Sequence, residues 1–542
     1  MVIDTFVSHR PGMPGEVTDM SQTASPRHLV LAALIAGAHR VSNTLHRARG
    51  TLIVAGAAGI VAAPELAAPL SFYDGGIAAS AATFIRHGEL PYRDFWLLYG
   101  PLAGYLGAVL TTIFGSRILV MQLAGLVLVM LTAAIGYRLI RAYAPGIRGG
   151  FIAVVAATIP TFWFGLNLGS WQLSLVLALL ALDVGLRGSP RSQLVAGGIV
   201  GLAALARLDL GAYALVALVV QSRSLRPVIG SAAVFAPVAL VFVLLVPLQT
   251  LWEQVIWYPL VGTQVFRKLP GPTPFGLLTG EEPMAWGLYY VPILLLGAAV
   301  VRRLVIGTSM TSLVGLTVLA LMVRLQTFGR ADPPHAVEAF GAGLLLAAYV
   351  MGEPSSFPRR LASALPAGLL CAVAALPLLW VVTPPSDYDR ALAEAASIIR
   401  SRTSPDEPIF VGEATNSRVL ANPLIVYFLA DRPAGVFDTM YNPGVTTTAA
   451  TQQRMVDDLA SHHVRYLVLD KTWSGCYEPS NASALPGSTI LDEAIARNYG
   501  VVADLGAVVI MASRDSKAAP VATSVWVDPG VPPVQGSIVC GP

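Results

Sequence analysis

The chain has 542 residues, of which 55% are hydrophobic and only 12% are charged. Soluble globular proteins carry about 25% charged residues, so this composition excludes an ordinary soluble protein and points to lipid as the solvent. The net charge of +3 gives no reason to expect a nucleic-acid partner, and the three cysteines show no metal-binding spacing.

The first 50 residues are polar and basic, and their one apolar stretch, 29–38, is too short to span a bilayer. No small-residue cleavage site follows this stretch. We therefore expect residues 1–50 to be a cytoplasmic tail and not a signal peptide.

Apolar runs recur through the next 330 or so residues, separated by short basic segments, as in polytopic membrane proteins. The expected spans are 51–68, 119–137, 150–166, 170–186, 193–206, 209–221, 228–247, 286–301, 304–324, 337–351 and 362–382. Basic residues follow every second span, on the side of the basic N-terminus; they are Arg138, Arg141, Arg148, Arg187, Arg191, Arg223, Arg226, Arg302, Arg303, Arg359 and Arg360. The positive-inside rule makes that side cytoplasmic, and an odd number of spans places the C-terminal part outside.

The loops on the opposite side collect polar residues of both signs, at about 69–118, 248–285 and 325–336. This asymmetry favours chemistry at the outer leaflet over a transport site at the membrane midplane. The first outer loop shows start and stop signals for a short amphipathic helix from Asp74 to Gly88, and a second helix is expected from Pro101 to Phe114. Both are expected to lie in the membrane interface.

The character of the chain changes after Pro384-Pro385. Short strand-like runs at 408–412, 464–469 and 507–511 alternate with helical patterns at 389–402 and 452–462, which is typical of an α/β domain. A bridge between Cys476 and Cys540 can form if this part lies outside the cytoplasm.

The sequence thus predicts an α-helical polytopic membrane protein. About 11 transmembrane helices occupy residues 51–383, a small extracytoplasmic α/β domain occupies 384–517, and a loose tail occupies 518–542.

Residues 73–76 read Tyr-Asp-Gly-Gly, residues 91–95 read Pro-Tyr-Arg-Asp-Phe and residues 99–102 read Tyr-Gly-Pro-Leu. These motifs and the order of the segments resemble the GT-C superfamily of membrane glycosyltransferases. The nearest group is that of the protein mannosyltransferases and the lipid A aminoarabinose transferases. Two departures are Asp-Gly where protein mannosyltransferases have Asp-Glu, and Tyr-Gly-Pro in place of His-Pro-Pro. A glycan or lipid acceptor is therefore as well supported as a protein.

The resemblance implies a polyprenyl-phosphate sugar as donor and an acceptor hydroxyl on the outer face of the cytoplasmic membrane. The acceptor would be an envelope glycan, lipid or protein, and a divalent metal is left open. By resemblance, Asp74 is the candidate base and Asp94 a second catalytic acid. The alternatives are that Asp74 only caps its helix and that Asp94 only pairs with Arg93.

The leaving phosphate needs cations, so the basic residues of the outer side are candidate substrate-binding residues. Arg330, Asp332 and His335 form a compact cluster in which Arg330 would grip the phosphate, unless it only pairs with Asp332. The other candidates are Arg207 and Asp209, at a tight turn where a structural ion contact is the alternative, and Arg267 and Lys268, for which the alternative is a solvated loop.

Two other functions fit the composition. A transporter or lipid flippase would need polar residues within the spans and related halves, and the sequence shows mostly apolar spans and no repeat. A non-catalytic envelope-assembly protein would be favoured if Asp74 were only a helix cap.

Overall fold

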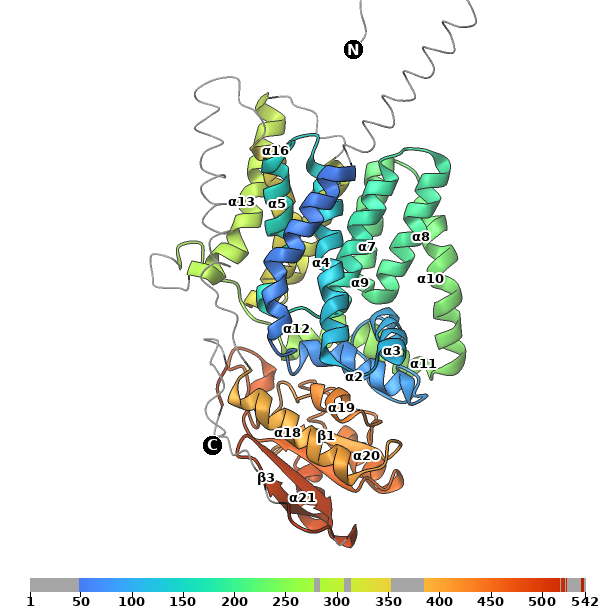
Figure 1. Ribbon diagram of the computed structural model, residues 1–542, viewed down its shortest axis with the longest axis vertical. Coiled ribbons are helices and arrows are strands. Elements are labelled where there is room, and N and C mark those ends of the chain that lie inside the picture. Colours follow the sequence, from blue (N-terminus) through green and yellow to red (C-terminus); the bar gives the residue numbers. More distant parts are fainter. Residues whose placement is uncertain are drawn as a thin grey trace, which may run out of the picture. The chain divides into compact units, whose positions relative to one another are not determined.

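The computed structural model describes residues 48–276, 283–306, 313–351, 385–516, 518–521, 523 and 538–540. The chain from Thr51 onward forms one compact unit. Its described part is mostly helical up to residue 351, and a smaller part of helices and strands follows (Figure 1). The predicted span 362–382 and most of the predicted tail 1–50 lie outside the described residues.

The helices of the first 351 residues are apolar, which makes the chain a membrane protein. Four described helices are long and apolar enough to cross a membrane: Ala48–Ala67, α4 (Ile118–Ile140), α10 (Arg226–Leu245) and Ala285–Leu304 within α13 (Pro283–Ile306). Shorter helices also follow predicted spans: α5 (Ile147–Thr158), α7 (Ser170–Gly185), α8 (Pro190–Ala206), α9 (Leu208–Ser222), α14 (Val314–Leu325), α15 (Pro333–Leu345) and α16 (Ala347–Val350). The labelled members of this set form a bundle (Figure 1).

Several predicted spans have limits that differ from those of the helices, and 150–166 and 286–301 are two of them. The span 150–166 is interrupted, because α5 ends at Thr158 and the short α6 (Thr161–Phe164) begins after Pro160, which has no N–H to continue the hydrogen-bond ladder. The run 286–301 continues to Ile306, so Arg302 and Arg303 belong to α13 and not to a loop.

The first outer loop contains α2 (Asp74–Arg86) and α3 (Leu102–Phe114), close to the predicted limits. The expectation that α2 is amphipathic is wrong, because every residue from Gly75 to Phe84 is buried. Small side chains make this burial possible on the side of α3, where a Cβ at Gly104 would lie 3.1 Å from that of Ala81. The helix that begins with Asp74 is therefore held from several sides.

The C-terminal part covers another side of α2. A Cβ at Gly76 would lie 2.7 Å from the backbone nitrogen of Ile425, at the start of α19 (Ile425–Ala430), so only glycine permits this approach. The same Ile425 nitrogen donates to the carbonyl of Phe72, and the nitrogen of Trp96 donates to the carbonyl of Phe437. The first outer loop and the C-terminal part thus share backbone hydrogen bonds.

A four-stranded sheet of order β1-β2-β4-β3 forms the centre of the C-terminal part. The runs predicted as strands appear as β1 (Ile409–Glu413), β2 (Tyr466–Asp470) and β4 (Val508–Ser513). β1 and β2 are parallel, and β4 is antiparallel to β2 and to β3 (Tyr499–Asp504). The predicted helices are α18 (Asp387–Arg402) and α20 (Ala449–Ser461), whereas β3 and α21 (Ile490–Asn498) were missed.

Cys476 and Cys540 form a disulfide bond that closes a separation of 64 residues. Beside it, the backbone of Tyr477 pairs with that of Val539. The prediction of a loose tail over 518–542 is therefore wrong for residues 538–540, because this bond and this pairing hold them; residues 524–537 lie outside the described part.

Glu89 gives the contact between the outer loop and the C-terminal part a pH dependence. Burial raises the pKa of Glu89 to about 8, although the Ala434 N–H donates to one of its oxygens at 3.0 Å. A carboxyl group with a raised folded-state pKa contributes stability that is fully present at a pH below its unfolded-state pKa. This stability is lost as the pH rises through the folded-state pKa. The parent should therefore lose on the order of 1–3 kcal/mol of unfolding free energy between about pH 5 and pH 8, and we expect Glu89→Gln not to show this loss. Thermal unfolding midpoints in detergent across this range test it; parallel curves for variant and parent would contradict it.

Candidate functional site

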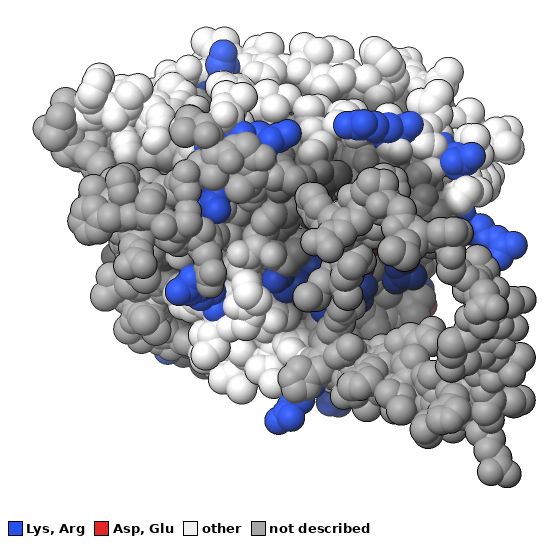
Figure 2. Space-filling model, turned by 90° about the horizontal axis from the view of Figure 1, so that it is seen from above, with Lys and Arg blue, Asp and Glu red and all other residues white. Residues whose placement is uncertain are grey.

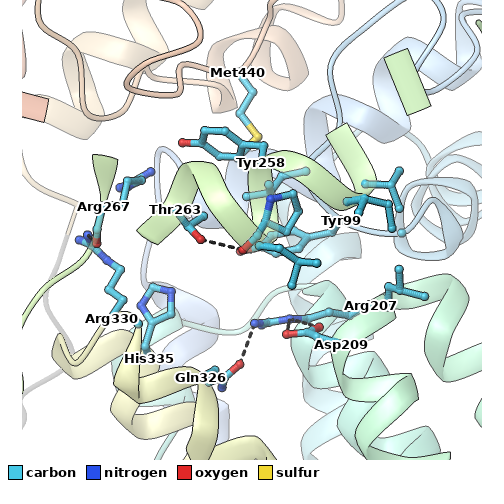
Figure 3. A pocket seen from close by; sticks show the side chains of 18 of the residues that line it. Tyr99, Arg207, Asp209, Tyr258, Thr263, Arg267, Gln326, Arg330, His335 and Met440 are labelled. Carbon is cyan, nitrogen blue, oxygen red and sulfur yellow. Dashed lines mark hydrogen bonds and ion pairs between the residues drawn. The ribbon is translucent and has the colours of Figure 1, made fainter. Parts of the chain in front are cut away.

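A cavity of about 1380 Å³ lies where the helical core, the outer loops and the C-terminal part meet. It is lined by residues of α2, the turn between α8 and α9, α10, the wide helix η2 (Trp252–Gly262), α12 (Thr263–Phe266), the loop before α15, and the C-terminal part. Figure 3 shows its labelled polar side chains in two groups, one with Arg207 and Asp209 and one with Arg267, Arg330 and His335. Of the nine residues expected in the site, seven line this cavity: Asp74, Arg207, Asp209, Arg267, Arg330, Asp332 and His335.

Asp74 is the first residue of α2 and faces the cavity. Tyr73 occupies the N-cap position, and no side-chain capping bond is present, so the structure does not support the alternative in which Asp74 only caps the helix. The carboxylate has no hydrogen bond or ion pair with the described residues. Its side chain is exposed to the cavity, but the surrounding protein still withdraws it from bulk solvent. This burial raises the pKa of Asp74, and the nearby His335 and Arg267 oppose the rise.

Arg267 follows α12 and is the cavity arginine with the fewest partners in the described part of the chain. Its Nε is buried without a hydrogen-bond partner, and its guanidinium lies beside the hydroxyl of Tyr73. The hydroxyl of Tyr258, which is fully buried and also lines the cavity, lacks a partner as well. Two cavity-lining residues that each carry a buried donor without an acceptor among the described residues favour an anion as the ligand.

Arg330 is fully engaged and does not fit the role of a free phosphate-binding cation that the sequence suggested. Its Nε lies 2.6 Å from Asp332, its Nη2 lies 2.6 Å from Glu478, and its Nη1 donates to the carbonyl of Arg267 at 2.7 Å. The alternative of an Asp332 partner is thus what the geometry shows, with Glu478 as a second partner. Arg330 therefore fixes the backbone of Arg267 and joins the C-terminal part to the cavity.

Asp332 also connects two neighbours. It caps α15 by accepting from the backbone nitrogen of His335 at 3.2 Å, and it lies 2.5 Å from Nδ1 of the same residue. Burial would raise the pKa of Asp332, but His335 and Arg330 outweigh it and hold the pKa below its ordinary value. An ionised Asp332 fixes the ring of His335 at the cavity wall.

Arg207 forms the centre of a second buried network. It is extended between α8 and α9, so its side chain meets Asp209 at 2.9 Å despite their close spacing. It also makes two bonds of 2.8 and 2.9 Å to Glu338 of α15 and donates to Gln326 at 3.0 Å. The structural ion contact left open by the sequence is present, and it ties α9 to α15 at the cavity floor.

Two expected site residues do not line the cavity. Asp94 accepts from Arg93 and from the backbone nitrogen of Leu90, so it closes a turn in the first outer loop. Lys268 is exposed. The adjacent residues Arg267 and Lys268 thus differ in surroundings, which makes them a natural pair for comparison.

Sequence reasoning missed three cavity residues that hold or surround these groups: Glu338, Glu478 and Tyr258. Glu338 carried a usable signal, since a carboxylate within an apolar span is costly and is usually paired. Glu478 and Tyr258 carried none, because their roles depend on contacts between distant segments. Among the described residues, no three carboxylate, imidazole or thiol groups gather closely enough to hold a metal ion.

The fold is similar to that of two solved structures of ArnT from Cupriavidus metallidurans. The apo structure has a TM-score of 0.55 and 14% sequence identity, and the match covers 89% of this chain and 100% of that one. The structure bound to undecaprenyl phosphate has a TM-score of 0.53 and 14% identity, with 88% and 99% covered. The chain therefore shares the fold of ArnT.

A weaker similarity is found to the Archaeoglobus fulgidus oligosaccharyltransferase in complex with Zn and sulfate. Its TM-score is 0.48 with 14% identity, and 83% of this chain and 71% of that chain are covered. No family model matches the sequence, and no curated protein matches it significantly. The expected GT-C resemblance is confirmed at the level of the fold.

Proposed function

We propose that the protein is a glycosyltransferase that moves a sugar from a polyprenyl-phosphate donor to an acceptor hydroxyl on the outer face of the cytoplasmic membrane. The observation that carries the proposal is the pairing of two side chains in one cavity. Within the described part of the chain, Asp74 offers a carboxylate without a hydrogen-bond or ion-pair partner, and Arg267 offers a guanidinium without a carboxylate partner. Base and phosphate ligand are the two groups that this transfer needs.

The transfer follows from these positions. The acceptor oxygen attacks the anomeric carbon of the donor, and the bond from that carbon to the phosphate oxygen breaks. Asp74 takes the proton of the attacking hydroxyl. Negative charge grows on the departing polyprenyl phosphate, where Arg267 and the hydroxyl of Tyr258 donate hydrogen bonds to it. Because Arg330 holds the carbonyl of Arg267, the guanidinium is positioned before the substrate binds.

The same cavity has an apolar wall suited to a prenyl chain. Phe235, Ala239, Phe242 and Val243 of α10 line it. The outer surface of α10 is largely exposed and apolar, as expected of a helix that faces lipid. A lipid-linked donor could therefore enter beside α10 with its phosphate toward Arg267. The complex of ArnT with undecaprenyl phosphate supports a donor of this class.

Two observations support a site outside the cytoplasm. The face in Figure 2 shows many Lys and Arg side chains and hardly any acidic ones, as expected for a cytoplasmic face under the positive-inside rule. The C-terminal part, in contrast, contains a disulfide bond, which persists in oxidising compartments. The proposed topology places the N-terminus inside and residues 385–542 outside. The acceptor would be an envelope glycan, lipid or protein.

Cysteine labelling in intact cells tests this topology. In a Cys371→Ser background, Asp406→Cys should react with a membrane-impermeant maleimide, because its side chain is 95% exposed on the C-terminal part. Arg187→Cys, exposed between α7 and α8, should react only after lysis. The opposite pattern would contradict the topology.

The activity itself is tested with the purified full chain in nanodiscs. Polyprenyl-phosphate pentoses and hexoses are supplied with envelope lipid or glycan extracts, and the release of polyprenyl phosphate is measured. We expect acceptor-dependent release for at least one sugar. If none of these donors binds or turns over, the proposed function is wrong.

A further inference from the structure

A second, smaller cavity of about 40 Å³ lies on the other side of Asp74. The loop between α6 and α7 and the first turn of α7 form one wall, and Asp74, Tyr99 and Glu338 belong to both this cavity and the larger one. A water molecule needs roughly 10–15 Å³ of such space. The cavity therefore has room for a few waters, or for one hydroxyl-bearing edge of a sugar ring.

The wall formed by α7 contains polar atoms that no described group satisfies. Gln172 is 6% exposed, and both its amide oxygen and its amide nitrogen are buried without a hydrogen-bond partner. Trp171 is 7% exposed, and its indole N–H is also without one. Buried polar atoms are nearly always paired, so two adjacent side chains in this state at a cavity indicate that a ligand supplies the partners.

The local sequence creates this wall. Residues 167–172 read Asn-Leu-Gly-Ser-Trp-Gln, and a Cβ at Gly169 would lie 2.6 Å from the side-chain oxygen of Asn167, so a larger residue here would displace that side chain. The turn leads directly into α7, which begins at Ser170. Trp171 and Gln172 are thus fixed in the first turn of a helix, next to N–H groups that have no acceptor within it.

The charges around the small cavity select against an anion. Among the described residues, the only cation in its wall is Arg207, and the guanidinium is already bonded to Asp209, Glu338 and Gln326. Asp74 and Glu338 add negative charge. A neutral group that both donates and accepts hydrogen bonds fits these surroundings, and a sugar hydroxyl does both.

We propose that Gln172 and Trp171 form a recognition subsite for ring hydroxyls of a sugar whose reacting atom lies at Asp74. This inference rests on the proposed function and adds a source of specificity to it. A site built to hydrogen-bond a hydroxyl strongly rejects an analogue that lacks it, because its own polar atoms then remain unpaired. The subsite would therefore select among sugars carried on the same lipid phosphate.

Two near-isosteric variants test the subsite in the full-length protein. Gln172→Met keeps the length of the side chain without its amide, and Trp171→Phe keeps an aromatic ring without the N–H. Each should lower kcat/KM for the best donor sugar by roughly tenfold. Each should also reduce the difference in kcat/KM between that donor and its monodeoxy analogues. Leu173→Met, a buried change in the same helix outside both cavities, is the matched control and should leave kcat/KM unchanged.

Sugar-free polyprenyl phosphate separates the subsite from the proposed function. All three variants should bind it as the parent does, which also shows that they are folded. A sugar hydroxyl can come from the donor or from the acceptor. Weaker binding of the sugar-bearing donor assigns the subsite to the donor, whereas unchanged donor binding with a raised acceptor KM assigns it to the acceptor.

The subsite is overturned if the parent transfers sugar and both variants retain its kcat/KM and its preference among deoxy analogues, since Gln172 and Trp171 would then hold only water. If the parent neither binds nor transfers any lipid-linked sugar, the proposed function fails and the subsite fails with it.

Discussion

Asp74→Asn should reduce sugar transfer by about 10²–10⁴-fold and leave donor binding within a few-fold of the parent. Asparagine has nearly the same shape, and Asp74 makes no hydrogen bond or ion pair with the described residues, so the substitution removes a base without removing a structural contact. Release of polyprenyl phosphate in nanodiscs measures the first quantity, and binding of the sugar-bearing donor measures the second. Near-parental turnover of Asp74→Asn would end the assignment of Asp74 as the base.

Asp94→Asn is the matched control for this experiment. Asp94 belongs to the same outer loop and was the second catalytic candidate on the sequence, but it bonds to Arg93 and does not line the cavity. We expect its transfer rate to stay within a few-fold of the parent. A loss as large as that of Asp74→Asn would show that the loop as a whole, and not the cavity carboxylate, governs the rate.

The pH profile gives an independent test of the base. A base acts in its ionised form, and burial raises the pKa of Asp74 above its ordinary value of 3.8. The acidic limb of the rate profile should therefore lie at higher pH than for an ordinary aspartate. Removal of the opposing imidazole in His335→Phe should move this acidic limb to still higher pH.

Arg267→Gln should weaken the binding of polyprenyl phosphate by roughly 10- to 100-fold, at an unchanged midpoint of thermal unfolding. The guanidinium of Arg267 has no carboxylate partner among the described residues, so its removal strands no buried anion. A charge-assisted hydrogen bond to a phosphate contributes about 1.5–3 kcal/mol, which corresponds to this range. Titration of polyprenyl phosphate into the protein in nanodiscs measures the affinity. Unchanged affinity would show that the phosphate lies elsewhere.

Two neighbours of Arg267 serve as controls with different expectations. Lys268→Ala removes an exposed cation next in the chain and should change neither affinity nor stability. Arg330→Met removes the partner of Glu478 and Asp332, whose side chains are 1% and 11% exposed. Because it removes a cationic partner from two buried carboxylates, it should lower the free energy of unfolding by about 3–5 kcal/mol. A selective loss of donor affinity in Arg330→Met without lost stability would return the phosphate-binding role to Arg330.

The fold was accessible from the sequence wherever a local signal decided it. Apolar runs marked most helices of the core, and the limits of α2 and α3 followed from Asp74, Gly88 and Pro101. The surroundings of α2 were not accessible, because glycine and alanine that allow close packing look the same in sequence as those on a weakly amphipathic surface. β3 was missed since its run, Tyr-Gly-Val-Val-Ala-Asp, has a glycine after its first residue, and glycine is depleted in strands.

The site, like the fold, was accessible from the sequence only where a local signal existed. Its residues could be proposed one at a time, from residue type and position on the outer side. Their partners could not, because Arg207 and Glu338 are 131 residues apart and Arg330 and Glu478 are 148 apart. Which arginine is neutralised by a carboxylate and which remains available depends on these long-range pairs. The sequence therefore favoured Arg330, whereas the structure favours Arg267 for the phosphate.

The pairing of Arg330 with Glu478 also determines when the cavity can be completed during biosynthesis. A chain made from the N-terminus onward would insert its helices while Glu478 is still to be translated, and Arg330 would then lack that partner. Glu478 lies two residues after Cys476, whose sulfur partner, Cys540, is made 64 residues later. The cavity can therefore be completed only after Glu478 has been synthesised. A shorter nascent chain would occupy the membrane without the ion pair that orders Arg330 and, through it, the backbone of Arg267.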